Sequence, residues 1–342
     1  MSRTELSSLG EFGLIRHLTE HFPVQQKSTI LGVGDDAAAI EVPAGMIAVL
    51  TTDMLIEGVH FDLSYVPLRH LGYKAVVVNL SDVYAMNAVP AQITVSIAVS
   101  NRFSLEAMEE LYAGMLAACE HYGVDLVGGD TSTSVSGLAI SVSAVGFVEK
   151  ARMSTRRNAR KGDLLCVTGD LGGAYLGLQV LEREKKVFLE SPGVQPELSG
   201  FEYVIGRQLK PEARRDLVQF FSEQQIVPTS MIDISDGLAS EILHLERNSG
   251  HGMVIYEEKI PIAADTGRVA EQFSLAPVTC ALSGGEDYEL LFTVGQSDYE
   301  KISANPSVSI IGYVDEPESS SRMVTRAGAT IAITAQGWNA FS

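Results

Sequence analysis

The sequence predicts a chain of mixed helices and strands, of the α+β or α/β class, folded as two domains. The chain has 342 residues, and a domain usually holds about 100–200 residues. Strand-like apolar segments alternate with segments of helical periodicity throughout the first half. The basic stretch KARMSTRRNARK at 150–161 then interrupts this pattern. We therefore place the domain boundary near residue 149, which gives domains at 1–149 and 150–342.

The first half contains four strand-like segments and two helical segments. The second helical segment begins at Ser104, a favourable N-cap, and apolar side chains recur in it at helical spacing. The apolar run at 137–148 is too short to span a bilayer, which needs about 20 residues, and it resembles a buried strand. The expected strands are Ile47–Thr51, Gln92–Val99, Val124–Val127 and Leu138–Val148, and the expected helices lie near Arg69–Asn87 and Ser104–His121.

The second half continues the same mixture of elements. A strand at Leu164–Thr168 precedes a helix at Gly172–Arg183, and the polar stretch Glu184–Gly200 is expected to be a loop or an insertion. The other expected elements are helices near Pro211–Glu223 and Asp236–Asn248, and strands at Met253–Tyr256, Tyr288–Val294, Ser307–Val314 and Thr330–Thr334.

Charge and cysteine content narrow the classes of function. The formal net charge of −18 argues against nucleic acid or an anionic membrane as a partner, because both require a basic surface. The N-terminal segment carries scattered charges and lacks an apolar core of signal-peptide length. Cys119, Cys166 and Cys280 are widely spaced and form no CxxC pair, so we expect neither a disulfide framework nor a zinc site. A cytoplasmic location is the simplest expectation.

Acidic residues gather in short motifs that are rich in Gly, Ser and Thr. Each motif adjoins an apolar segment, so the carboxylates can converge where strands end. Carboxylates in one cleft repel one another, and a divalent cation removes this repulsion. Carboxylate and hydroxyl oxygens suit Mg²⁺, which often joins protein acids to substrate phosphates. The motifs are GDD at 34–36, TTD at 51–53, NLSD at 79–82, GGDT at 128–131, DISDG at 233–237 and GGED at 284–287.

Turns and the common nucleotide-binding motifs account for these residues less well than a metal cluster does. Any single Gly-Asp pair is more often a turn, but six such motifs together favour a metal cluster. The sequence has no GxxxxGK[ST] motif, which excludes a P-loop, and no HRD or DFG pair of the protein kinases. Gly32, Gly34 and Ala37 loosely match a dinucleotide fingerprint. Two aspartates inside that match would repel a pyrophosphate, so we reject it.

Taken together, several motifs resemble the thiamine-monophosphate kinase family in order and spacing. They are GVGDDAAAI, LTTDMLIEGVHFD, YKAVVVNLSDVYAMNAVP, VGGDTS, IDISDGL and LSGGEDYELLFTV. This family belongs to the superfamily of aminoimidazole ribonucleotide synthetase and selenophosphate synthetase. The resemblance implies an α+β fold of two domains and a homodimer whose N-terminal strands form a shared barrel. It also implies transfer of a phosphoryl group from ATP to thiamine monophosphate, with several Mg²⁺ ions.

The resemblance assigns roles to particular residues. Thr51 and Thr52 are expected to bind metal partly through backbone oxygen, and Tyr112 is a weaker nucleotide assignment. The magnesium ligands implied are Asp36, Thr51, Thr52, Asp53, Asp82, Asp130, Asp233 and Asp236. The residues implied for ATP are Gly129, Asp130, Arg156, Ser235 and Tyr112, and those for the thiamine substrate are His60, Glu286 and Trp338.

Several of these residues would also fit an ordinary structural role. Arg156 lies in a basic stretch that resembles a solvated linker, and Glu286 resembles a turn acid. His60 resembles a structural histidine, and Trp338 a hydrophobic anchor for the C-terminal tail. The family often ends in Gly-Trp-Asp-His-Phe, whereas this chain has Gly-Trp-Asn-Ala-Phe at 337–341, so any role of the missing Asp-His pair is in doubt.

No residue is expected to act as a general acid or base. The acceptor is a phosphate monoester with a second pKa of about 6, so it is already mostly dianionic at neutral pH.

Rival functions are the other ATP-using enzymes of the superfamily and a non-catalytic binder of metal or nucleotide. Selenophosphate synthetase relies on a reactive residue near its N-terminus, and this chain has no cysteine before Cys119.

Overall fold

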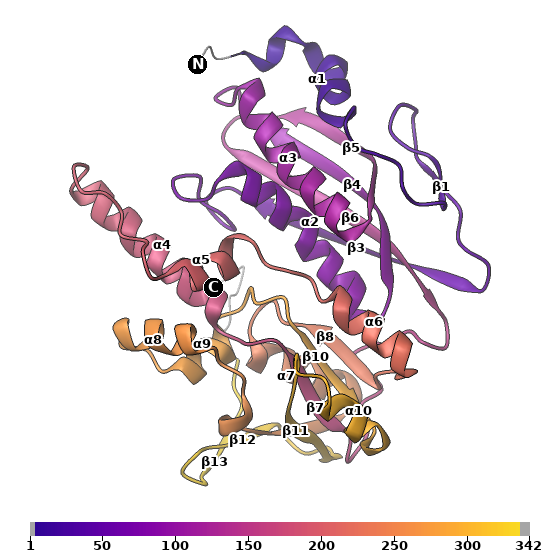
Figure 1. Cartoon of the computed structure of the whole chain (residues 1–342), viewed down its shortest axis with the longest axis vertical. Helices are drawn as coiled ribbons and strands as arrows, with labels where there is room; N and C mark the ends of the chain where they lie inside the picture. Colours follow the sequence, from indigo (N-terminus) through magenta and orange to yellow (C-terminus); the bar gives the residue numbers. More distant parts are fainter. Residues whose placement is uncertain (1–3, 336–342) are drawn as a thin grey trace. The chain divides into compact units, whose positions relative to one another are not determined.

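The computed structural model describes residues 4–335 and divides into two compact units (Figure 1). Unit 1 comprises the residues up to Tyr84 together with Ala88–Ala151. Unit 2 comprises Ala85–Asn87 and the residues from Arg152 onward. The short segment Ala85–Asn87 is fixed to the rest of unit 2 by Met86, whose carbonyl accepts from the Ser154 amide at 3.2 Å.

Unit 1 is built on a four-stranded sheet of order β3-β6-β4-β5. Strand β6 is antiparallel to both neighbours, and β4 is parallel to β5. Helices α2 and α3 lie against one face of this sheet (Figure 1). The strands are β3 (Met46–Ile56), β4 (Val89–Val99), β5 (Asp125–Thr133) and β6 (Leu138–Glu149), and the helices are α2 (Leu68–Ala85) and α3 (Leu105–Tyr122).

The two faces of this sheet differ in burial. Along β6, residues at alternate positions such as Ile140 and Val142 are buried beneath the helices. The opposite face bears exposed apolar side chains from β3, among them Leu50 at 74% and Met54 at 54% exposure. Within the described residues the sheet is open and does not close into a barrel. One chain therefore shows the mixed fold that was expected, but not the shared barrel.

The N-terminal part of unit 1 is anchored by one buried acid. Helix α1 (Gly10–Thr19) and the small pair β1 (Thr29–Leu31) and β2 (Ala39–Ile40) precede the main sheet. The carboxylate of Asp125, at the start of β5, accepts from the Gln25 amide at 2.7 Å, the Gln26 amide at 3.0 Å and the Thr29 hydroxyl at 2.7 Å. This carboxylate fixes the segment that leads to the GDD motif.

Unit 2 contains a seven-stranded sheet of order β13-β12-β9-β11-β7-β10-β8. The neighbouring strands are antiparallel except for β12 and β9, which are parallel. The strands are β7 (Leu164–Thr168), β8 (Ser230–Asp233), β9 (His251–Tyr256), β10 (Leu290–Val294), β11 (Val308–Pro317), β12 (Arg322–Val324) and β13 (Thr330–Ala332).

The helices of unit 2 enclose two apolar clusters. One cluster joins the sheet to α7, through residues such as Ile242 and Leu291. The other joins α4, α5, α8 and α9, through residues such as Val180 and Val269. The three cysteines of both units, Cys119, Cys166 and Cys280, are buried and form no disulfide. The helices are α4 (Gly173–Glu190), α5 (Glu202–Leu209), α6 (Arg215–Gln224), α7 (Leu238–Ser249), α8 (Ala264–Gln272), α9 (Pro277–Ser283) and α10 (Tyr299–Ser303).

Several sequence-based boundaries are wrong, three of them because a strand or helix continues beyond its expected end. The strand expected at Ile47–Thr51 continues as β3 to Ile56. The stretch Glu184–Gly200 is not wholly a loop, because α4 continues to Glu190. The last turns of this helix carry consecutive exposed apolar residues, which give no helical periodicity. Strand β5 does not stop at Val127 but runs to Thr133. The glycines at 128 and 129 looked like a strand end, but they lie inside the ladder to β4.

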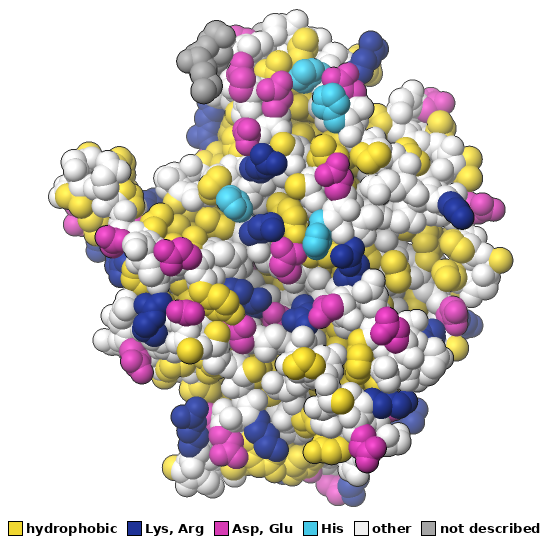
Figure 2. All heavy atoms as spheres, in the orientation of Figure 1, with side chains coloured by type: hydrophobic (Ala, Val, Ile, Leu, Met, Phe, Trp, Pro, Cys, Tyr) yellow, Lys and Arg dark blue, Asp and Glu magenta, His cyan; other side chains and the backbone are white. Residues whose placement is uncertain are grey.

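No helix among residues 4–335 combines the length and the apolar character needed to cross a membrane. On the face drawn in Figure 2, acidic side chains are dispersed among Lys and Arg, which form no broad basic field there.

Candidate functional site

In unit 1, three of the predicted magnesium ligands lie together beneath the sheet. Thr51 and Asp53 occupy alternate positions of β3 and face the helices, whereas Asp82 lies on α2. The Thr51 hydroxyl donates to Oδ2 of Asp82 at 2.5 Å. This geometry gathers one hydroxyl and two carboxylates from a strand and a helix.

The two carboxylates of this group destabilise each other. Burial first, and then repulsion by Asp82, raises the pKa of Asp53 from its ordinary value of 3.8 to about 6. A divalent cation held by these oxygens would remove the repulsion, and the donor set has the hard character that Mg²⁺ prefers. The residues present therefore fit magnesium.

Asn79 is a residue of this group to which the sequence motifs assigned no role. Its side-chain oxygen accepts from the Asp53 amide at 3.0 Å, and its Nδ2 donates to the Ala75 carbonyl at 3.0 Å. Asn79 and Asp82 are three positions apart on α2, so they share one side of the helix. That spacing in the NLSD motif was the available signal.

Asp130 lies on the other face of the sheet from Asp53. The residue of β5 in the same row as Asp53 is Gly129, through Val142 of β6 and Val95 of β4. Asp130 is the next residue of β5, so its side chain points to the opposite face. Adjacent strands are about 4.8 Å apart, so three strand steps separate the two carboxylates by about 14 Å. One chain does not place Asp53 and Asp130 around one ion.

Thr52 also points away from the Asp53 group. Its hydroxyl donates to the Val142 carbonyl at 3.1 Å and accepts from the Ser143 hydroxyl at 3.0 Å. These contacts occupy the Thr52 side chain on the open face. The partly backbone role toward the metal that the resemblance implies is compatible with this arrangement.

Gly129 and Tyr112 have structural roles within unit 1. A Cβ at Gly129 would collide with the carbonyl oxygen of Val95, so the close approach of β4 and β5 by itself requires glycine there. Tyr112 is buried on α3, where its ring meets Phe22 edge to face at 6.3 Å between centroids. Burial raises the pKa of Tyr112 to about 12, so its phenol stays protonated.

Asp36 and His60 form hydrogen bonds to their own neighbours in sequence. Asp36 is exposed, and its amide donates to the Asp35 carboxylate at 2.9 Å. Nδ1 of His60 accepts from the Ile56 amide at 3.0 Å, so a neutral ring carries its proton on Nε2. His60 is thereby oriented by the end of β3.

In unit 2, the DISDG and GGED motifs form two interlocked loops. They extend the pairing of β8 with β10, because the Tyr288 amide donates to the Ile234 carbonyl at 2.9 Å and the Glu286 amide donates to the Ser235 carbonyl at 2.7 Å. Gly285 has φ of +72°, and a Cβ there would lie 2.5 Å from the Ser235 carbonyl oxygen. Glycine is therefore needed where the loops touch.

The loop that carries Glu286 is strained and firmly held. Glu286 and Tyr288 have φ of 58° and 51°, a region that side chains other than glycine rarely adopt. Asp287 is buried between them, and its carboxylate accepts from the Gly172 amide at 2.8 Å. Nε2 of Gln208, on α5, donates to Oε2 of Glu286 at 2.6 Å. These contacts fix the predicted substrate residue.

A network of largely buried charged side chains also holds the loop that carries Glu286. Arg207 donates to the Asp287 carbonyl at 3.2 Å and to the Glu289 carboxylate at 3.0 Å. Arg214 also reaches Glu289, at 2.9 Å. Because each buried charge has an opposite partner, removing one partner would leave an uncompensated charge in the interior. The network ties α5 to the segment just before β10.

Arg156 lies near the DISDG loop. Burial raises the pKa of Asp236, and His244 and then Arg156 oppose that rise. Burial, and then Arg156, lower the pKa of His244. Asp233 is buried at the end of β8. Arg156, Ser235, Asp236 and Glu286 therefore belong to one region of unit 2.

Some predictions stay untested by this geometry. Trp338 lies outside the described residues. Among residues 4–335, no group of three or more His, Cys, Asp or Glu side chains lies close enough to hold a metal.

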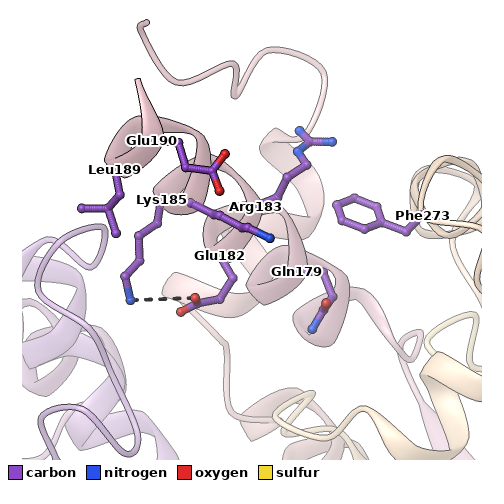
Figure 3. Close-up of a pocket in the computed structure, with 8 residues that line it drawn as sticks. Gln179, Glu182, Arg183, Lys185, Leu189, Glu190 and Phe273 are labelled. Atoms are coloured by element: carbon purple, nitrogen blue, oxygen red, sulfur yellow. Dashed lines mark ion pairs between the residues drawn. The ribbon is translucent and has the colours of Figure 1, made fainter. Parts of the chain in front are cut away.

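A surface pocket occurs elsewhere, along α4 and opposite Phe273, lined by residues such as Arg183 and Lys185 (Figure 3). It contains none of the predicted site residues.

Comparisons with known proteins support the interpretation of the motifs. The profile of the AIR synthase related protein, N-terminal domain, matches residues 34–148. Thiamine-monophosphate kinase of Aquifex aeolicus is 38% identical over 92% of this chain and 94% of its own length. That of Bacillus subtilis is 31% identical over 97% of this chain and 100% of its own length.

A solved structure gives the same answer for the fold. The structure of AaThiL complexed with AMPPCP and TMP is similar over 100% of both chains, with 34% sequence identity and a TM-score of 0.74. Similarity in sequence and in fold thus extends over almost all of both units, and the chain belongs to the thiamine-monophosphate kinase family.

Proposed function

We propose that this protein transfers a phosphoryl group from ATP to thiamine monophosphate, which yields thiamine diphosphate and ADP. The observation that carries the proposal is the similarity, over 100% of both chains, to AaThiL complexed with AMPPCP and TMP. AMPPCP is an analogue of ATP, so that complex pairs the donor and the acceptor of this reaction. The chain retains the acidic and glycine motifs that a metal-assisted transfer needs.

The proposed mechanism is direct in-line transfer without a protein nucleophile or general base. Phosphoryl transfer depends chiefly on positioning and on neutralising charge. The acceptor phosphate is mostly dianionic at neutral pH, so no side chain has to remove a proton from it. The task of the protein is to hold two polyanions together in line.

Several Mg²⁺ ions are part of the proposal. When bound, they neutralise the phosphate oxygens and orient the donor and the acceptor. Thr51, Asp53 and Asp82 are one oxygen group suited to an ion in unit 1. The other ligands that we propose are Asp36, Thr52, Asp130, Asp233 and Asp236.

The remaining residues bind and orient the substrates in this proposal. Arg156 offers a planar, bidentate cation for phosphate, and its charge acts on Asp236, the residue that follows Ser235. Glu286 is held by Gln208 in a fixed orientation and suits the amino group of the thiamine pyrimidine. Gly129, Tyr112, His60 and Trp338 keep the nucleotide and substrate roles that the family resemblance implies.

A homodimer is the assembly that we propose. The open face of the unit 1 sheet bears Leu50 and Met54, which are 74% and 54% exposed, and exposed apolar strands favour association. Asp130 lies on this open face, so packing two such sheets face to face would place Asp130 of each copy in or beside the interface.

The test is ADP release by the purified protein with MgATP, with and without thiamine monophosphate, together with detection of thiamine diphosphate. We expect ADP release that depends on the substrate, matching thiamine diphosphate, and loss of both with EDTA. Binding of ATP without turnover would favour a regulator. No turnover with thiamine monophosphate would overturn the proposal and direct the test to the substrates of the related synthetases.

A further inference from the structure

One buried acid in unit 2 contacts the predicted site loop but is absent from the family assignments. Glu241 lies in the first turn of α7 and is 1% exposed. Its Oε1 accepts from the Asp236 amide at 2.8 Å, the Ser235 amide at 3.0 Å and the Ser235 hydroxyl at 3.3 Å. A single oxygen thus holds the backbone and the side chain of the loop.

These contacts are not those of an ordinary helix cap. A capping side chain satisfies the free amides of the first helical turn. Here the Ser240 and Glu241 amides already donate to the Gly237 carbonyl, at 2.9 Å and 3.3 Å. Glu241 bonds instead to amides that precede the helix. Its carboxylate orients the loop rather than the helix.

The second oxygen of Glu241 lowers the net stabilisation that the residue contributes. Oε2 is buried and has no hydrogen-bond partner within the described residues. A buried carboxyl oxygen without a partner is costly, and an apolar residue would avoid that cost. Conflicts of this kind are expected at functional positions.

The loop is also fixed from its other side. The Ser235 carbonyl accepts from the Glu286 amide at 2.7 Å. The amide of Ser235 is thus held by Glu241 and its carbonyl by Glu286. Removing Glu241 would free the amides of Ser235 and Asp236, while the link to Glu286 would stay. The effect should therefore be larger for ligands of Ser235 and Asp236 than for those of Glu286.

We propose that Glu241 is a positioning residue, which sets the orientation of Ser235 and Asp236 toward the nucleotide and its metal. This inference rests on the proposed function. Its role is to accept hydrogen bonds, so an amide oxygen at the same place should serve nearly as well. The structure thereby predicts rescue by glutamine but not by alanine or aspartate.

The experiment compares wild type with Glu241→Ala, Glu241→Gln and Glu241→Asp in steady-state kinetics. The loss of the three hydrogen bonds to the loop is large enough that we expect KM for MgATP to rise about tenfold in the alanine and aspartate variants. KM for thiamine monophosphate should change less than about threefold. The glutamine variant should stay within about threefold of wild type. Aspartate keeps the charge and covers the case in which the alanine variant does not fold.

Glu246→Ala is the matched control on the same helix. Glu246 accepts from the Ser321 amide at 2.9 Å, away from the loop, so this variant should lower the melting temperature without changing KM for MgATP. A wild-type KM in Glu241→Ala and Glu241→Asp would overturn the inference. So would a glutamine variant as impaired as alanine.

A binding measurement separates this inference from the proposed function. The affinity for MgAMPPCP, measured by calorimetry, needs no turnover of thiamine monophosphate. If the wild type binds MgAMPPCP but does not turn over, the proposed function fails while a weaker affinity in Glu241→Asp still supports the role of Glu241. Equal affinities of wild type and Glu241→Asp would overturn that role even in an active enzyme.

Discussion

Gln208 donates from its side-chain nitrogen to Oε2 of Glu286 at 2.6 Å. The two residues lie 78 positions apart in sequence, and the contact joins α5 to the strained GGED loop. A hydrogen bond of this length is a close contact. It fixes the direction in which the Glu286 carboxylate points, which matters if Glu286 recognises an amine of the substrate.

Replacing Gln208 by Leu should therefore weaken substrate binding. Leucine keeps most of the volume but removes the donor, so we expect KM for thiamine monophosphate to rise about tenfold with KM for MgATP nearly unchanged. Steady-state kinetics with each substrate varied in turn measures both. Equal increases in the two constants would instead indicate general damage to unit 2.

The Asp53 carboxyl should make the stability of the metal-free protein depend on pH. Its pKa is raised from 3.8 to about 6 in the folded chain, first by burial and then by Asp82. The folded state therefore holds this proton more tightly than the unfolded state. The resulting stabilisation is complete below the ordinary pKa and is lost as the pH rises through about 6.

Asp53→Asn isolates this effect. In EDTA, the variant should gain stability relative to wild type as the pH rises from about 5 to about 7.5, as melting curves would show. Mg²⁺ should raise the melting temperature of wild type more at the higher pH than at the lower one, because protons compete for Asp53, and should have less effect on the variant. A difference between the two proteins that is independent of pH would contradict this account.

Asp125 should be essential for the fold of the N-terminal segment. It is fully buried and accepts from two backbone amides and the Thr29 hydroxyl. We expect Asp125→Ala to lower the free energy of unfolding by about 3 kcal/mol, as measured in urea. Hydrogen exchange should rise first at residues 24–31. Exchange that rises evenly throughout the chain would show that Asp125 does not act locally.

Asp130 should be required for turnover but not for stability. It is exposed on β5, so Asp130→Asn should leave the melting temperature unchanged. Because we propose it as a metal ligand, its replacement should lower kcat by at least about a hundredfold. Glu149→Gln, an exposed acid at the end of β6, is the control. Near-normal turnover in Asp130→Asn would remove it from the ligand set.

Leu50 should be a determinant of the proposed dimer. A charge at this exposed apolar position of β3 would have to be desolvated in a sheet-to-sheet interface. We expect Leu50→Glu to change the mass measured by light scattering from that of two chains to that of one. Val135→Glu, at a fully exposed apolar residue outside the strands, should not do so. A wild-type protein that is already a monomer would refute the dimer.

The sequence predicted regular elements well where periodicity and end signals agreed. Ser104 was expected as a cap, and its side chain accepts from the Ala107 amide at 3.3 Å. The prediction failed where a local signal had a tertiary cause. Gly129 ended the expected strand, although glycine is needed there because Val95 passes close to it inside the sheet. The end of α4 was missed because Val187, Phe188 and Leu189 are consecutive exposed apolar residues there and give no helical periodicity.

The sequence by itself determined the class of fold, the family and the types of side chain available for metal and phosphate, because these depend on residue identity, order and periodic spacing. Tertiary structure alone decided which of those side chains meet. Only strand register shows that Asp130 faces away from Asp53, and only the packing of α2 on the sheet brings Asp82 to Asp53. Only packing reveals Asn79, Gln208 and Glu241 as supports of the site residues. The physical reason is that hydrogen bonds and repulsion between charges act over a few ångströms in space, whatever the separation along the chain.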